Sequence, residues 1–217
     1  MSRARPLILV TSFEPFGGSP VNPTMAIAQE LAAMPCSVGS RTYATLPVVT
    51  GIAAGSTWAT VEPILDALQP DAVVALGESA KADRINLERV AINLRDARIA
   101  DNSGVQLVDA AVIDGAPDAR FSSLPLREML AACESAGVPA TLSLSAGTFL
   151  CNELMYRLQH RASPRMSGFI HVPQLPEQAL ERGGPAMDAA TSARGIHAAL
   201  EALASSLLRR GSAGDMA

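Results

Sequence analysis

Along the chain, short runs of apolar residues alternate with segments whose apolar residues recur at helical spacing. The runs at 6–12 (PLILVTS) and 71–77 (DAVVALG) are almost continuous, which is typical of strands buried on both faces. Segment 141–145 predicts a further central strand and 168–173 another strand. Segment 90–94 alternates apolar with polar residues, as a strand with one polar face does. This alternation of strands and helices predicts a layered α/β domain.

Helices are predicted where apolar residues fall on one face at intervals of three and four. The first follows Asn22 and Pro23, which resemble an N-cap and a proline at the first helical position. The other predicted helices cover residues 57–68, 126–137, 152–161 and 196–207. No internal repeat or linker interrupts the 217 residues, so we expect a single domain over 1–210 and a disordered tail at 211–217.

Composition and charge narrow the classes of function. Hydrophobic residues make up 48% of the chain, which supplies a core and excludes a disordered or fibrous protein. The net charge of −4, from 17 basic and 21 acidic residues, gives no broad basic surface for nucleic acid or an anionic membrane. The uncharged stretch 42–61 is long enough to span a bilayer, but Pro47, Gly51, Gly55 and many hydroxyl groups argue against that.

The three cysteines are an odd number without a paired spacing, which indicates free thiols and a reducing cytoplasm rather than a disulfide framework. Cys36 follows a proline and Cys133 lies on an apolar helical stripe, so both are expected to be structural. Cys151 differs because it opens a predicted helix directly after a strand and a tight loop. Unpaired amides at a helix N-terminus favour a thiolate and can bind an oxyanion, although a small buried side chain is the simpler interpretation.

Two further residues suit a nucleophile of this kind. His171 lies near the end of a predicted strand, where open α/β sheets gather functional side chains. Glu88 precedes the alternating strand and could orient a histidine, or could form a surface ion pair with Arg84 or Arg89. The sequence contains no HxH, HExxH or CxxC spacing, so it does not predict a metal site.

The loop at 13–21 (FEPFGGSPV) contains two glycines before a helix, a setting that can bind phosphate. Its spacing matches neither of the glycine-rich nucleotide-binding motifs, GxGxxG or GxxxxGK[ST], so nucleotide binding has weak support. The two phenylalanines that flank the turn, Phe13 and Phe16, could instead form the walls of a small apolar pocket.

Four blocks occur in order along the chain: VTSFEPFGGSPVNPT (10–24), INLERVAIN (85–93) with RIADNSG (98–104), SAGTFLCN (145–152) and GFIHVPQLPEQ (168–178). Together with LPV at 46–48 they resemble pyroglutamyl-peptidase I, or pyrrolidone-carboxylate peptidase, a family of cysteine peptidases. The resemblance implies a three-layer α/β/α sandwich around a mixed, mostly parallel sheet. It also implies a homotetramer without a metal or organic cofactor.

By this resemblance Cys151 is the nucleophile, His171 the general base and acid, and Glu88 the carboxylate that orients the histidine. The implied reaction removes an N-terminal pyroglutamate from a peptide through a thioester. Peptides that carry this group are then the expected partners, with no nucleic acid or membrane. Asp101 is a second carboxylate expected near the site and a rival to Glu88.

The family places the lactam ring between aromatic side chains, and this chain has aromatic residues at the matching positions. A neutral, flat ring suits such a pocket, whereas burial of a charged amino terminus is costly. Asn22 and Arg98 match positions linked to lactam recognition and the oxyanion region. The expected substrate-binding residues are therefore Phe13, Phe16, Asn22, Glu78, Arg98, Phe149 and Leu150.

One block departs from the family pattern. Where the family usually reads Gly-Gln-Ala-Gly-Gly-Arg, residues 77–84 read GESAKADR, so Glu78 replaces the glutamine, Lys81 a glycine and Ala82 the arginine. Arg84 is a candidate to supply the missing guanidinium. We expect residue 78 to face substrate with its backbone, since an ionised carboxylate there would oppose a thiolate. The departure leaves two alternatives open: a cysteine hydrolase for another small cyclic or blocked acyl amide, and a binding module without activity.

Overall fold

The computed structural model describes residues 5–164 and 166–214. Six strands form one sheet: β1 (Leu7–Phe13), β2 (Ser40–Leu46), β3 (Ala72–Glu78), β4 (Ile85–Glu88), β7 (Ala140–Ser143) and β8 (Met166–Val172). Their order across the sheet is β2-β1-β3-β8-β4-β7. Neighbouring strands are parallel except β4 and β8, so the sheet is mixed but mostly parallel. A separate two-stranded sheet pairs β5 (Val90–Ile92) with β6 (Ala119–Phe121).

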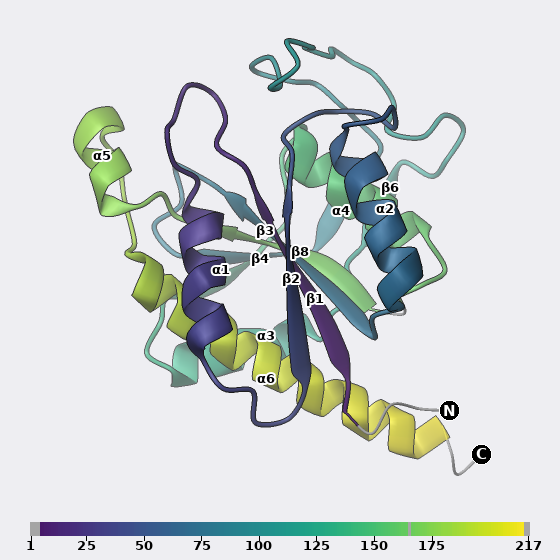
Figure 1. Ribbon diagram of the computed structural model, residues 1–217, viewed down its shortest axis with the longest axis vertical. Helices are drawn as coiled ribbons and strands as arrows, with labels where there is room; N and C mark the ends of the chain where they lie inside the picture. Colours follow the sequence, from purple (N-terminus) through teal and green to yellow (C-terminus); the bar gives the residue numbers. More distant parts are fainter. Residues whose placement is uncertain (1–4, 165, 215–217) are drawn as a thin grey trace.

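Helices cover both faces of the large sheet, which gives the predicted three-layer α/β/α arrangement (Figure 1). One layer contains α1 (Pro23–Ala33), α3 (Leu126–Ser135) and α6 (Ala189–Gly214). The opposite layer contains α2 (Thr57–Leu68) and α4 (Leu150–His160). The short helix α5 (Pro176–Arg182) lies beside the loop that joins β1 to α1 (Figure 1). In the part of the chain that the structure describes, no helix is both long and apolar enough to cross a membrane.

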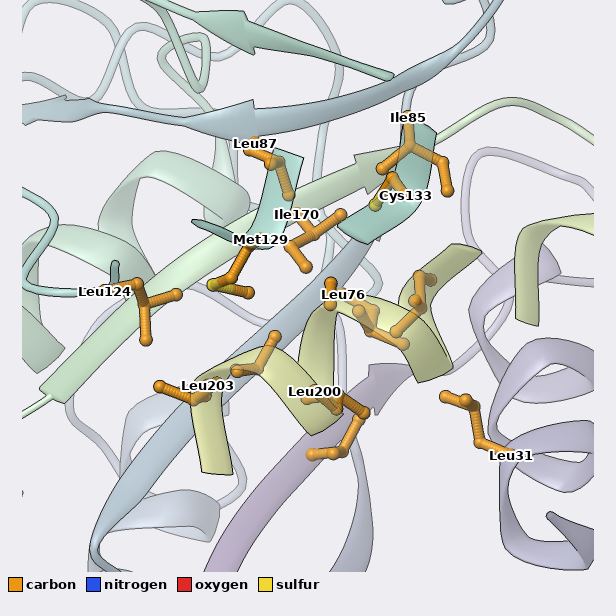
Figure 2. Packing of buried hydrophobic residues seen from close by; sticks show 14 of the residues in the cluster. Leu31, Leu76, Ile85, Leu87, Leu124, Met129, Cys133, Ile170, Leu200 and Leu203 are labelled. Atoms are coloured by element: carbon orange, nitrogen blue, oxygen red, sulfur yellow. The ribbon is translucent and has the colours of Figure 1, made fainter. Parts of the chain in front are cut away.

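The core of the first layer is formed by residues from strands and helices that are distant in sequence (Figure 2). Leu76 of β3 and Ile170 of β8 lie at the centre of the sheet and are fully buried. Met129 and Cys133 of α3 and Leu200 of α6 cover them from the helical layer. The Cys133 thiol donates to the Gly195 carbonyl at 3.3 Å. Cys133 is therefore a packing residue, as its place on an apolar stripe predicts.

The register around β8 determines which side chains meet at its carboxyl end. In the parallel pair with β3, Gly77 lies opposite His171. In the antiparallel pair with β4, Asn86 lies opposite His171, so Glu88 is its diagonal neighbour on the same face. The antiparallel direction of β4 therefore brings a carboxylate to a histidine that is 83 residues away in sequence.

Several predicted elements differ from those in the structure. The strand predicted at 141–145 is the edge strand β7, and the alternating segment at 90–94 belongs to the small sheet as β5. Elements that the pattern did not predict are β2, β4, β6 and α5. Strand β2 (SRTYATL) is polar because it is an edge strand, and β4 is too short to show a period. Helix α6 continues to Gly214, into the tail predicted to be disordered, and 215–217 lie outside the described residues.

Candidate active site

Cys151 is the second residue of α4, and its side chain is half-buried. The N-cap residue, Phe149, has no side-chain group that accepts a hydrogen bond, so it leaves the first amides of the helix uncapped. Asn152 fixes the start of the helix to the β5 segment. Its side chain accepts from the Ile92 amide at 2.9 Å and donates to the carbonyls of Ile92 and Leu94. The sulfur is thus held on a rigid helix start, close to amides that can stabilise negative charge.

His171, on β8, contacts both a carboxylate and the cysteine. Its Nδ1 lies 2.8 Å from Oε1 of Glu88, and a second side-chain hydrogen bond links the imidazole to Cys151. Because Glu88 occupies Nδ1, Nε2 is the atom left for the sulfur. The imidazole also packs against the Phe169 ring, with the two centroids 4.8 Å apart. Glu88 is 1% exposed, and among the described residues its Oε2 has no hydrogen-bond partner.

These contacts change the protonation of His171. Burial alone lowers the pKa of the imidazole. The Cys151 sulfur and the Glu88 carboxylate together raise the pKa by more than burial lowers it, so the net pKa lies above its ordinary value. An imidazolium between a carboxylate and a sulfur is an arrangement that favours a thiolate. The geometry therefore provides a nucleophile, a proton carrier and an orienting carboxylate in one chain of contacts.

Gly77 at the end of β3 allows the backbone to approach this group closely. A Cβ atom at this position would lie 2.9 Å from the Cys151 sulfur and 2.6 Å from the ring of Phe169. Both distances are shorter than van der Waals contact, so a larger residue would displace the sulfur or the ring. A glycine that ends a buried apolar strand was the sequence signal for this close approach.

A small cavity adjoins the sulfur and contains almost all of the predicted substrate-binding residues. Its volume is about 20 Å³, room for about one water molecule, so its walls lie close together. The rings of Phe16 and Phe149 are neighbours, with centroids 6.4 Å apart and planes tilted by 41°. The lining residues are Phe13, Phe16, Asn22, Val48, Glu78, Phe149, Leu150 and Cys151. Val48 was missed as a site residue, although it belongs to the LPV block at 46–48.

Two of the candidate residues lie away from this cavity. Arg98 is exposed and is not among the residues that line it. Asp101 is buried, and it accepts hydrogen bonds from the amides of Thr50, Ser103 and Val105. Burial raises the pKa of Asp101, but these hydrogen-bond donors together lower the pKa by more, so the net pKa is below its ordinary value. Asp101 therefore organises two loops, while Glu88 is the carboxylate in contact with His171.

The altered block at 77–84 is held by a partner that the sequence did not predict. Arg84 does not supply the missing guanidinium, because it pairs with its neighbour Asp83 at 2.8 Å on the surface. The carboxylate of Glu78 instead accepts from Arg182 of α5 at 2.9 Å. Its side chain is 2% exposed while the residue as a whole is half-buried, so the exposed part of residue 78 is mainly backbone.

Both the sequence and the fold of this chain are similar to those of known proteins. The sequence profile of the pyroglutamyl peptidase family matches residues 7–206. The pyrrolidone-carboxylate peptidase of Gloeobacter violaceus is 44% identical over 202 residues, which cover 91% of this chain and 97% of the relative. Among solved structures, pyroglutamyl peptidase I of Bacillus amyloliquefaciens matches with a TM-score of 0.86 and 33% identity, over 93% of this chain and 98% of that chain. A mutant pyrrolidone carboxyl peptidase of Pyrococcus furiosus matches with the same TM-score at 36% identity, over 93% and 99%.

The contrast between the cysteines predicts selective alkylation. Cys151 should react fastest with iodoacetamide at neutral pH, because His171 and the start of α4 both favour its thiolate. Cys133 should stay unlabelled, since burial raises the pKa of its thiol to about 11. Peptide mapping after brief treatment measures this, and a Cys151→Ser variant should lose the fast-labelled peptide. Faster labelling of Cys36 or Cys133 would contradict the assignment.

Proposed function

This chain belongs to the pyroglutamyl peptidase family, and from that premise we propose that it removes N-terminal pyroglutamate from peptides by cysteine catalysis. The observation that carries the proposal is the contact chain from Glu88 through His171 to Cys151 beside an aromatic-walled cavity. In this proposal Cys151 is the nucleophile, His171 the general acid and base, and Glu88 the orienting carboxylate.

The first half of the reaction forms a thioester. The Cys151 thiolate attacks the carbonyl carbon of the pyroglutamyl residue, and the carbonyl oxygen gains the negative charge. Amides at the start of α4 are placed to stabilise this oxyanion. When the carbon–nitrogen bond breaks, the His171 imidazolium gives its proton to the leaving amine of the peptide. Thioester and neutral imidazole remain.

The second half releases the acyl group. The neutral imidazole of His171 takes a proton from water, and the hydroxide attacks the thioester carbon. Collapse of the intermediate breaks the carbon–sulfur bond and expels the thiolate, which again faces an imidazolium. Glu88 keeps the ring in the same orientation in both halves, because it engages Nδ1 and leaves Nε2 toward the reacting atoms.

The cavity supports selection of a small neutral ring. The tilted rings of Phe16 and Phe149 line it, and Phe13 and Leu150 add further apolar surface. A flat lactam can lie between such rings, whereas a charged amino terminus would lose its hydration without gaining a partner. Asn22 is part of the wall, but its side chain is already bonded to Glu14 and Thr24, so its role is to hold the loop.

The proposal extends to assembly and location. We expect residues 1–210 to act as one domain, in the cytoplasm, as a homotetramer. Three free thiols support a reducing compartment, and the family resemblance supports the tetramer.

The proposed specificity predicts the outcome of a panel of aminocoumarin amides. The pyroglutamyl amide should be cleaved, and the prolyl and glutamyl amides, which carry a charged amino group, should be cleaved far more slowly. Fluorescence release measures all three under the same conditions. Equal or absent turnover across the panel would contradict the proposal, and turnover of another cyclic or blocked amide alone would favour the alternative cysteine hydrolase.

The proposed roles predict a ranking of variants. Cys151→Ala and His171→Ala should each abolish turnover, because the nucleophile and its proton carrier act as a unit. Glu88→Gln should retain more activity, since orientation and stabilisation of the imidazolium supply only part of the rate enhancement. Asp101→Asn is the matched control for loss of a buried carboxylate, and steady-state kinetics with thermal unfolding compares the two. A larger loss from Asp101→Asn in a folded protein would assign the orienting role to Asp101.

A further inference from the structure

Glu78 is the centre of a buried polar cluster that the reaction above does not use. Its Oε1 accepts from Arg182 at 2.9 Å, and its Oε2 accepts from Nε2 of Gln178 at 3.3 Å. Both partners belong to α5, which follows His171 along the chain by way of a proline-bounded turn. We call Glu78, Gln178 and Arg182 the Glu78 cluster.

Successive residues of a strand point to opposite faces, and this separates the charge of Glu78 from the sulfur. Gly77 lies against Cys151, so the side chain of Glu78 points to the other face of the sheet, toward α5. The carboxylate is almost completely buried there, whereas the Arg182 side chain is 35% exposed. Arg182 is thus the cation that compensates a buried charge immediately behind the wall of the acyl cavity.

Gln178 extends the cluster to a third segment. It is 3% exposed, and its Nε2 also donates to Oγ of Ser19 at 3.2 Å and to the carbonyl of Val21 at 3.4 Å. Ser19 and Val21 belong to the loop that carries Phe16, and Figure 1 shows this loop running alongside α5. One amide group therefore joins the end of β3, the start of α5 and the loop with the aromatic wall.

We propose that Arg182 is a positioning residue for the acyl pocket: by neutralising Glu78 it keeps α5 and the Phe16 loop seated against the end of β3. The physical reason is the cost of an unpaired buried charge. When one partner of a buried ion pair is removed, the remaining charge is strongly unfavourable, whereas removal of both partners costs much less. Without Arg182, the Glu78 carboxylate would be released toward solvent and would pull apart the contacts that Gln178 makes.

The kinetic test of this inference rests on the proposed function. It measures the effect of Arg182→Gln in two backgrounds, one with Glu78 and one with Glu78→Gln. With Glu78 present, Arg182→Gln should lower kcat/KM for the pyroglutamyl aminocoumarin about tenfold, mainly through KM, because the pocket wall is displaced. With Glu78→Gln in place, the same change should cost less than about twofold. Arg182→Lys, which keeps the charge, should retain most of the activity in the Glu78 background.

Arg161→Gln is the matched control, because it removes ion pairs with Glu62 and Asp66 at the opposite end of α4 from Cys151. It should leave kcat/KM unchanged. An equal loss from Arg182→Gln in both backgrounds would mean that Arg182 only anchors α5, and no loss in either would mean that it has no role; both results overturn the inference.

Thermal unfolding of the wild type, Arg182→Gln, Glu78→Gln and the double variant separates this inference from the proposed function. Arg182→Gln should lower Tm by several degrees with Glu78 present and by much less with Gln at position 78. If the wild-type protein does not cleave the pyroglutamyl amide, the proposed function fails, and the Tm values still decide the inference. Equal Tm losses in the two backgrounds would overturn it.

Discussion

The contact between His171 and Glu88 is the interaction on which the rest of the site depends. A carboxylate that is 1% exposed, and whose side-chain hydrogen bond among the described residues is the one to His171, is stable only next to a positive or donating group. His171 supplies that group, and the shared proton directs the other ring nitrogen toward Cys151. The pyroglutamyl peptidase chemistry proposed for this chain uses that directionality in both halves of the reaction.

The topology of the sheet is what makes this contact possible. Four of the five strand pairs in the large sheet are parallel, and the fifth, the antiparallel pairing of β4 with β8, places Glu88 diagonally across from His171. Helix α4 brings Cys151 to the same place from the opposite layer, and Gly77 lets the backbone of β3 approach the sulfur. Residues from β3, β4, β8 and α4 therefore converge at one point although they are spread over nearly 100 positions of sequence.

The apolar pattern was sufficient to predict the buried strands β1, β3 and β8 and the long helices, because their periods are strong. It could not predict β4, whose four residues are too few for a period and whose direction depends on tertiary pairing. The motifs around Cys151, His171 and Glu88 identified the candidate group, and the structure brings these residues into contact. The pairing of Glu78 with Arg182 was not predictable, because a guanidinium 104 residues away leaves no local signal. The prediction that Arg84 supplies the missing guanidinium was wrong, because Arg84 forms an ion pair with its neighbour Asp83 instead.

The protonation of His171 tests the central claim most directly. An NMR titration of the imidazole should show that it remains protonated well above its usual pKa of about 6.5, since a raised pKa shifts deprotonation to higher pH. Glu88→Gln and Cys151→Ala should each lower the titration midpoint, because each removes a contact that favours the imidazolium. A wild-type midpoint at or below the usual value, unmoved by either substitution, would contradict the account.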